Sequence, residues 1–205
     1  IVHNIKLIYV SSMQVYKGYG KNNLSINSKI NLNNSYSKSH YESEKIIKSK
    51  FLDHKSMFTI LRIGNVFGFK KYDKLKKVQN NIIHGLCILA LKKKIFLIRN
   101  GAIQRVFIPS QIFVETINLV IKKKFLKNSI INIVYKSFNL KSVAQIIQKR
   151  CKLALNLTVD ITIKNFSKKN LFTIYANQNF KFNPTNKLFF FEIDQILKNL
   201  NKYLN

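Results

Sequence analysis

The stretch KLIYVSSMQVY, from Lys6 to Tyr16, decides how the chain is expected to fold. Lys6 to Ser12 is a short apolar run with β-branched and aromatic residues, which is typical of a buried strand. This strand ends on two hydroxyl side chains, Ser11 and Ser12. The polar segment from Ser25 to Ser35 is rich in asparagine and serine, so we expect a loop there.

Strands and helices alternate along the rest of the chain. The spacing of apolar and charged residues predicts helices over Tyr36–Phe51, Val78–Lys94 and Ser110–Lys124, and strands over Met57–Ile63 and Ile130–Tyr135. Such alternation predicts an α/β fold with a mostly parallel sheet.

Several segments resemble the extended short-chain dehydrogenase/reductase family of nucleotide-sugar epimerases, dehydratases and reductases. YVSSMQVY (9–16) and YSKSHYESEK (36–45) resemble its catalytic half, LRIGNVFG (61–68) its LRxxNVYG strand end, and RNGAIQRVFIPSQIFVETI (99–117) its GDGxxxRDFIPVxDVxxAI segment. Residues 128–147 and 186–204 are similar, more loosely, to a strand-loop-helix unit and a C-terminal helix of the family. The order and spacing of these segments extend the resemblance over nearly the whole chain.

The resemblance implies a partial Rossmann-like, doubly wound parallel sheet with a smaller α/β substrate-binding subdomain. We expect residues 1–68 and 104–136 to form the C-terminal half of a dinucleotide-binding domain, and residues 69–103 and 137–205 to form the nucleotide-sugar subdomain. The family's opening GxxGxxG phosphate loop has no counterpart, since Gly18 and Gly20 have no plausible helix after them and are interpreted as a surface turn. The first residue is Ile1, so we expect the C-terminal portion of a longer enzyme.

The resemblance also implies three catalytic residues. Ser12 would orient the reacting hydroxyl, with Ser11 as an alternative that the family's spacing disfavours. Tyr36 would be the base, and His40 occupies the position of the family's lysine, four residues later. Tyr36 and His40 are thus also the expected cofactor contacts.

The histidine changes the expected chemistry. A phenol titrates near about 10, so it needs a nearby cation to act as a base at neutral pH. A cation about 4 Å away contributes on the order of 4 kcal/mol at an effective dielectric near 20. An imidazole is only partly charged at pH 7, so His40 would deliver less of this field, although it could donate to a ribose or relay a proton. The alternative is that His40 is an ordinary polar residue of a non-catalytic helix.

Two further residues are implied substrate contacts. Asn65 follows a strand end, and Arg105 matches an arginine that binds the nucleotide diphosphate, a task that suits a guanidinium because it pairs with two phosphate oxygens. Alternatively, Asn65 caps a turn and Arg105 is a surface charge. The family's next residue is aspartate, but Val106 stands here.

Composition excludes several other classes. The net charge of +28 invites a nucleic-acid interpretation, but the lysines are spread along all 205 residues, and their short runs fall mostly at the ends of predicted helices. Cys87 and Cys151 have no CxxC spacing and are expected to be buried or half-buried thiols. No apolar run is long enough for a membrane span, and no histidine spacing indicates a metal site.

The sequence therefore predicts an NAD(P)-dependent nucleotide-sugar epimerase, dehydratase or reductase in the cytoplasm, with NAD or NADP as cofactor and a homodimer by analogy. The alternative is a non-catalytic or truncated relative that serves as a binding or oligomerisation module. A basic nucleic-acid-associated protein is the third interpretation.

Overall fold

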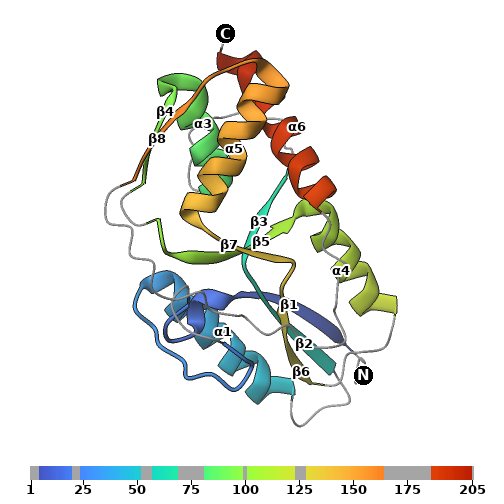
Figure 1. Ribbon diagram of the computed structural model, residues 1–205. Coiled ribbons are helices and arrows are strands. Elements are labelled where there is room, and N and C mark those ends of the chain that lie inside the picture. Colours follow the sequence, from blue (N-terminus) through green and yellow to red (C-terminus); the bar gives the residue numbers. More distant parts are fainter. Residues whose placement is uncertain are drawn as a thin grey trace.

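The computed structural model describes residues 5–19, 24–51, 57–68, 81–98, 101–122, 128–163 and 186–204. Figure 1 shows a lower part with β1, β2, β6 and α1, and an upper part with α3, α5 and α6. Some residues named in the predictions lie outside these ranges. They are Gly20, the start of the helix predicted over Val78–Lys94 and the end of the helix predicted over Ser110–Lys124.

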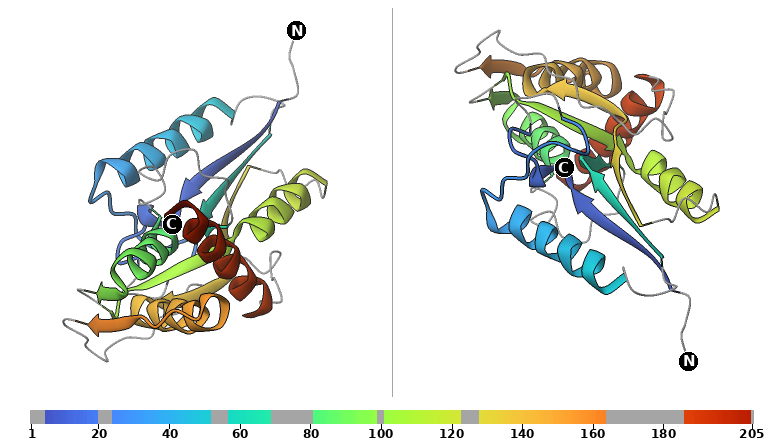
Figure 2. Two further views of the ribbon diagram at one scale, coloured as in Figure 1. Left: turned by 90° about the horizontal axis from the view of Figure 1, so that it is seen from above. Right: turned by 90° about the horizontal axis from the view of Figure 1, so that it is seen from below.

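Three parallel strands form the sheet of the lower part. They are β1 (Lys6–Ser12), β2 (Met57–Ile63) and β6 (Ser129–Ile133), in the order β1-β2-β6. Helix α1 (Ser35–Phe51) connects β1 to β2, and Figure 2 shows α4 (Ser110–Lys122) on the opposite side of this sheet. The predicted α/β class and the predicted strands and helices of this part are confirmed, with small differences in bounds. Helix α1 begins one residue earlier than expected, and β6 begins one residue earlier and ends two residues earlier.

The upper part is built around short strands and three packed helices. Strand β5 (Gln104–Pro109) pairs in parallel with β3 (Asn65–Phe67) and antiparallel with β7 (Lys136–Asn139), while β4 (Ile95–Ile98) pairs in parallel with β8 (Asp160–Ile163). Helices α3 (Ile82–Lys93), α5 (Leu140–Leu155) and α6 (Asn186–Leu204) bury their apolar faces in one core. Aromatic rings of Phe67, Phe107 and Phe189 meet edge to face in that core.

Both cysteines lie in this core, as predicted. Cys87 of α3 and Cys151 of α5 are fully buried and free. Burial raises the pKa of the Cys87 thiol well above its ordinary value and that of Cys151 to about 11. The two thiols are therefore protonated and unreactive at neutral pH.

A glycine allows β5 to approach the end of β2. A Cβ atom at Gly64 would lie 2.5 Å from the carbonyl oxygen of Val106, closer than any side chain tolerates. Immediately after it, the Asn65 side chain donates to the same carbonyl oxygen at 3.1 Å. The absence of a side chain at Gly64 thus brings Asn65 and β5 together.

A buried ion pair holds α1 on the parallel sheet. Glu44 accepts from Arg62 of β2 twice, Nε to Oε1 at 2.9 Å and Nη2 to Oε2 at 2.5 Å, and the two residues are 0% and 2% exposed. Ser11 donates to Glu44 Oε1 at 2.6 Å, and Ser11, Arg62 and Asn132 form one row across β1, β2 and β6. The Arg62 guanidinium lies 4.7 Å from the ring centre of Tyr16, which donates to Asn132 at 2.7 Å.

This pairing keeps the guanidinium charged despite its burial. Burial alone would lower the pKa of Arg62, but hydrogen bonds with Glu44 and the interaction with Tyr16 raise it above its ordinary value. Because each charge is desolvated, either partner left alone would be strongly unfavourable.

We expect Glu44→Gln to lower the free energy of unfolding by about 3–5 kcal/mol, since it leaves Arg62 as a buried charge without its counter-ion. Urea denaturation measures the change. Glu42→Gln on the same helix is the matched control, because Glu42 is 45% exposed in its pair with Lys45 and should contribute less than about 1 kcal/mol. Equal losses in the two variants would contradict the structural role of the buried pair.

Candidate functional site

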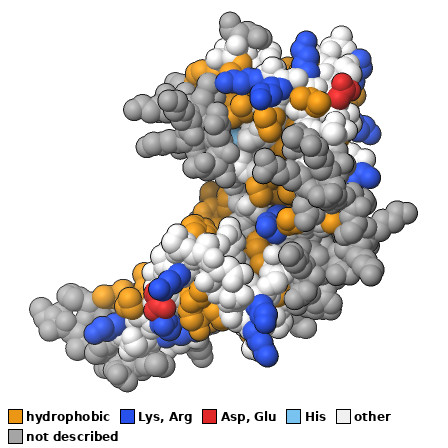
Figure 3. Space-filling view, turned by 90° about the vertical axis from the view of Figure 1, so that its left-hand side faces the viewer, with side chains coloured by type: hydrophobic (Ala, Val, Ile, Leu, Met, Phe, Trp, Pro, Cys, Tyr) orange, Lys and Arg blue, Asp and Glu red, His pale blue; other side chains and the backbone are white. Residues whose placement is uncertain are grey.

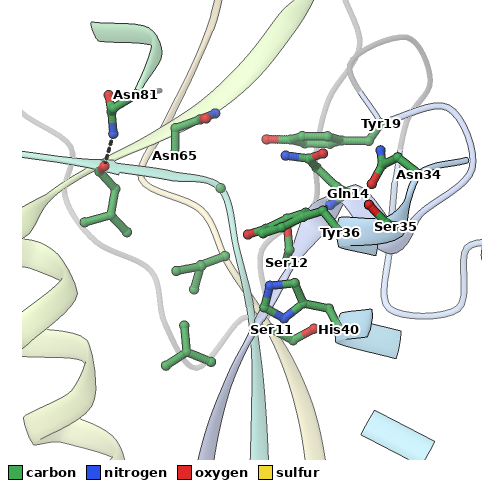
Figure 4. Close-up of a pocket in the computed structure, with 14 residues that line it drawn as sticks. Ser11, Ser12, Gln14, Tyr19, Asn34, Ser35, Tyr36, His40, Asn65 and Asn81 are labelled. Carbon is green, nitrogen blue, oxygen red and sulfur yellow. Dashed lines mark hydrogen bonds between the residues drawn. The ribbon is translucent and has the colours of Figure 1, made fainter. Parts of the chain in front are cut away.

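A cavity of about 760 Å³ opens at the carboxyl ends of β1 and β2, beside the first turns of α1. Ser12, Tyr36, His40 and Asn65, four of the five predicted site residues, line it. Figure 4 shows their side chains around this space, and Figure 3 shows the surface hollowed between the two parts of the molecule. The carboxyl ends of parallel strands are the usual place for ligands in such folds.

The structure distinguishes the two serines at the end of β1. Ser11 is committed to Glu44 by the hydrogen bond at 2.6 Å. The Ser12 hydroxyl accepts from the backbone N–H of Gln14 at 3.2 Å, where it caps the 3-10 turn Met13–Val15, and it lines the cavity. Both serines line the cavity, but the Ser11 hydroxyl is engaged with Glu44, so Ser12 is the better candidate for a contact with a ligand.

Tyr36 lies in the first turn of α1. The Asn34 side chain caps the helix by accepting from the backbone N–H of Ser37 at 2.8 Å. Tyr36 is 51% exposed, and its ring meets the edge of the His40 imidazole with a centroid distance of 4.5 Å. The spacing of four residues therefore places phenol and imidazole side by side, as predicted for one face of a helix.

His40 is held from the strand side. Its Nδ1 atom lies 3.1 Å from the hydroxyl of Tyr9, a residue that sequence reasoning did not single out. Burial lowers the pKa of His40 below its ordinary value, and the nearby Glu44 only partly offsets this effect. His40 is therefore neutral at pH 7, not the protonated form that a purely electrostatic role would need.

A second tyrosine on α1, Tyr41, also has a lysine four residues later, Lys45, but this pair lies outside the described lining of the cavity. Tyr41 is partly buried against the core of the lower part. Lys45 pairs with Glu42 at 2.7 Å, 52% exposed, with its ammonium 5.7 Å from the Tyr41 ring centre. Neither Tyr41 nor Lys45 is among the described residues that line the cavity.

Arg105 lies in an adjoining cavity of about 410 Å³, which Lys17 also lines. Its guanidinium donates to the carbonyl oxygens of Gln104 at 3.0 Å and Tyr19 at 3.4 Å, and lies 5.0 Å from the Tyr19 ring centre. The Tyr19 hydroxyl accepts from the backbone N–H of Val106 at 3.3 Å. Tyr19 thus gives Arg105 the local support that the valine at position 106 cannot provide.

The two cavities share a wall. Gln14, Tyr19 and Asn34 line both of them, and Asn81 lines the larger one from the start of α3. Burial lowers the pKa of Arg105, with a small opposing effect of Tyr19, but the ordinary value is so high that the guanidinium stays charged. Of these residues, only Asn34 had a visible signal, an asparagine just ahead of a predicted helix.

Other kinds of site find no support in the described part of the chain. Its histidine, cysteine and acidic side chains form no cluster that could hold a metal ion. His84, on α3, instead contacts the Gly68 carbonyl oxygen through Nε2 at 3.0 Å. None of the helices in the described part of the chain has the length and apolar character needed to span a membrane. On the face shown in Figure 3, lysine and arginine side chains are dispersed over both parts and do not form one patch.

Comparisons with known proteins bear on the family and the fold of the chain. The profile of the NAD dependent epimerase/dehydratase family matches residues 2–133. UDP-N-acetylglucosamine 4-epimerase from Methanobrevibacter ruminantium M1, solved with UDP-N-acetylmuramic acid, is 18% identical with a TM-score of 0.72, over 97% of this chain and 63% of that one. An NAD dependent NDP-hexosamine 5,6-dehydratase involved in tunicamycin biosynthesis is 15% identical with a TM-score of 0.73, over 97% and 64% of the two chains. UDP-glucose 4-epimerase from Bifidobacterium longum, solved with NAD+ and UDP, is 17% identical with a TM-score of 0.67, over 96% and 63%.

At these identities the likeness to solved structures shows a shared Rossmann-like α/β fold, and the chain spans less than two-thirds of the length of the three proteins named. A search of curated proteins found no match. The family profile is a separate observation that matches more than half of the chain and includes the resembling segments 9–16, 36–45, 61–68 and 99–117, whereas the looser resemblance after residue 133 lies outside it. The chain belongs to the NAD dependent epimerase/dehydratase family.

Proposed function

We propose that this protein acts on a nucleotide-activated sugar in an NAD- or NADP-dependent reaction of the epimerase, dehydratase or reductase type. The observation that carries the proposal is that Ser12, Tyr36 and His40 line one cavity with Asn65, while Arg105 lines the next. The family match and the nucleotide-sugar chemistry named for the similar structures support the same reading.

The two cavities fit the two halves of such a substrate. Hydroxyl and carboxamide side chains line the larger cavity, among them Ser12, Gln14, Asn34 and Asn65. These groups both donate and accept, as sugar hydroxyls do. The guanidinium of Arg105 in the adjoining cavity suits a diphosphate, which needs positive charge and paired donors.

The nicotinamide end of a dinucleotide also fits the larger cavity. Tyr36 and His40 line it with a hydroxyl and an imidazole, which can hold ribose hydroxyls, at the carboxyl ends of parallel strands. When bound, the nicotinamide supplies the acceptor for the hydride that leaves the sugar carbon.

Side chains of this protein would remove and return the proton of the reacting sugar hydroxyl. Ser12 would hold the reacting sugar hydroxyl, and Tyr36 as phenolate would take its proton while the carbon is oxidised to a ketone. In the reverse direction, Tyr36 would return the proton to the carbonyl oxygen. Because His40 is neutral, the field that would favour phenolate is weaker than beside a lysine.

A non-catalytic binding or oligomerisation module is the second candidate. It is favoured by one observation: none of the described residues that line the larger cavity with Tyr36 is a lysine or arginine. Such a module would bind the nucleotide sugar without turning it over.

The domain division belongs to the same proposal. Residues 1–68 and 104–136 would form the dinucleotide-binding part, and residues 69–103 and 137–205 the sugar-binding part. Two groups of buried side chains support most of this division, one around β1, β2, β6 and α4 and one around α3, α5 and α6, although Phe67 of β3 and Phe107 of β5 belong to the second group.

We expect Tyr36→Phe to reduce turnover of a UDP-sugar about 10²- to 10⁴-fold, as for loss of a general acid-base group. The measurement is kcat with UDP-glucose and NAD on the protein expressed from its complete reading frame, with UDP-glucose binding followed by calorimetry. Tyr41→Phe, on the same helix but outside the cavity, is the control and should leave kcat unchanged. Turnover retained in Tyr36→Phe would refute the base; binding without turnover in the wild type would select the module.

Arg105→Gln should weaken UDP binding about 10- to 100-fold, the effect of losing a hydrogen bond to a charged group of about 1.5–3 kcal/mol. Calorimetry with UDP measures it. Lys152→Gln, an exposed lysine of α5, controls for the lost charge. If both variants bind UDP alike, Arg105 is not the diphosphate contact.

The two serines should separate stability from turnover. Ser11→Ala removes a buried hydrogen bond to a carboxylate and should lower the free energy of unfolding by about 2 kcal/mol. Ser12→Ala removes only the cap of a short turn, about 1 kcal/mol, but should reduce kcat more than Ser11→Ala does. Urea denaturation and kcat of the two variants test this; the opposite order in kcat would reassign the substrate contact to Ser11.

A further inference from the structure

We propose that Tyr9 fixes the tautomer of His40, so that the neutral imidazole carries its hydrogen on Nε2 and presents an N–H donor to the larger cavity. Tyr9 would then be a positioning residue, acting through His40. The inference rests on the proposed function only for the identity of the group that receives this donor, a ribose or sugar hydroxyl.

The first step is the geometry between strand and helix. Tyr9 and Ser11 are two residues apart, so their side chains leave β1 on the same face. His40 and Glu44 are four residues apart, so they share one face of α1. Tyr9 contacts His40 at 3.1 Å and Ser11 contacts Glu44 at 2.6 Å. The buried Glu44 therefore anchors the helix that brings His40 to Tyr9.

The second step is the choice of tautomer. A neutral imidazole has one donor nitrogen and one acceptor nitrogen, and the partner of one nitrogen determines which is which. A phenolic hydroxyl is a better donor than acceptor, because its lone pair is partly delocalised into the ring. Tyr9 therefore donates to Nδ1 of His40, and the hydrogen of the imidazole resides on Nε2.

The third step is the direction of the remaining donor. The His40 ring lies between two phenols, with centroid distances of 6.0 Å to Tyr9 and 4.5 Å to Tyr36. His40 and Tyr36 line the cavity, whereas Tyr9 is not among its described lining residues (Figure 4). With Nδ1 turned to Tyr9, Nε2 is the nitrogen left for a ligand in the cavity.

The arrangement has a clear chemical consequence. His40 can donate one hydrogen bond in a fixed direction but supplies no charge. It thus retains the hydrogen-bonding part of the role that the resemblance gives to a lysine at this position, and Tyr9 is what directs it.

Nitrogen-15 NMR of the imidazole tests the inference without any ligand. In the wild-type protein at pH 7.5, the long-range proton-nitrogen pattern of His40 should be that of the Nε2–H tautomer. In Tyr9→Phe, the shifts of the two nitrogens should move toward each other as the tautomers mix, whereas Tyr41→Phe should leave them unchanged. A wild-type His40 with its hydrogen on Nδ1, or an unchanged pattern in Tyr9→Phe, would overturn the proposal.

A double-mutant cycle tests the consequence at the site. Tyr9→Phe should weaken NAD binding about 3- to 10-fold, one neutral hydrogen bond, but have no effect when His40→Lys is already present. Equal losses in both backgrounds would mean that Tyr9 is merely structural. If no variant binds or turns over its ligands while wild-type His40 is Nε2–H, the proposed function fails and the tautomer assignment stands.

Discussion

The ion pair between Glu44 and Arg62 is the constraint on which the site depends. A bidentate pair of two buried groups tolerates little displacement, so it fixes the height and rotation of α1 on β2. Tyr36, His40 and Glu44 follow one another at intervals of four residues and so lie on one side of the helix. Anchoring Glu44 therefore also sets where the phenol and the imidazole enter the cavity. Replacing such a pair by apolar residues often costs no stability, which suggests that its value here is precise placement.

The second constraint is the close approach of β5 to the end of β2. Gly64 permits this approach because it has no side chain, and the Asn65 side chain donates to the Val106 carbonyl oxygen. The backbone N–H of Val106 in turn donates to the Tyr19 hydroxyl. Tyr19 then supports Arg105 in the adjoining cavity. A series of hydrogen bonds thus connects the end of β2, at the larger cavity, to the Arg105 guanidinium in the adjoining cavity.

The fold was predictable where the sequence pattern is long. The seven-residue strands β1 and β2 and helix α1 have enough residues to show a period and were predicted almost to their ends. Strands β3, β7 and β8 have only three or four residues each, too few for a period, and were not predicted.

The candidate site likewise contains residues that the sequence predicts and residues that it does not. Ser12, Tyr36, His40 and Asn65 could be named from ordered motifs. The partners that hold the site could not, because the bonds from Tyr9 to His40, Arg62 to Glu44 and Arg105 to Tyr19 join residues 31, 18 and 86 positions apart. Only the three-dimensional structure reveals such pairs.

The described residues that line the two cavities differ in charge. The chain has a net charge of +28, yet the polar side chains among the described residues that line the larger cavity are hydroxyls, carboxamides and the His40 imidazole. Lys17 and Arg105 line the adjoining cavity, whereas Tyr36 lines the larger one. Neutral groups suit the hydroxyls of a sugar, which need direction more than charge, whereas cations suit a diphosphate. His40 occupies the position that the resemblance gives to a lysine, and none of the described residues that line the larger cavity with it is a lysine or arginine. In the proposed function, the described side chains of this cavity would therefore orient a sugar by hydrogen bonds, and Arg105 in the adjoining cavity would supply the charge for a diphosphate.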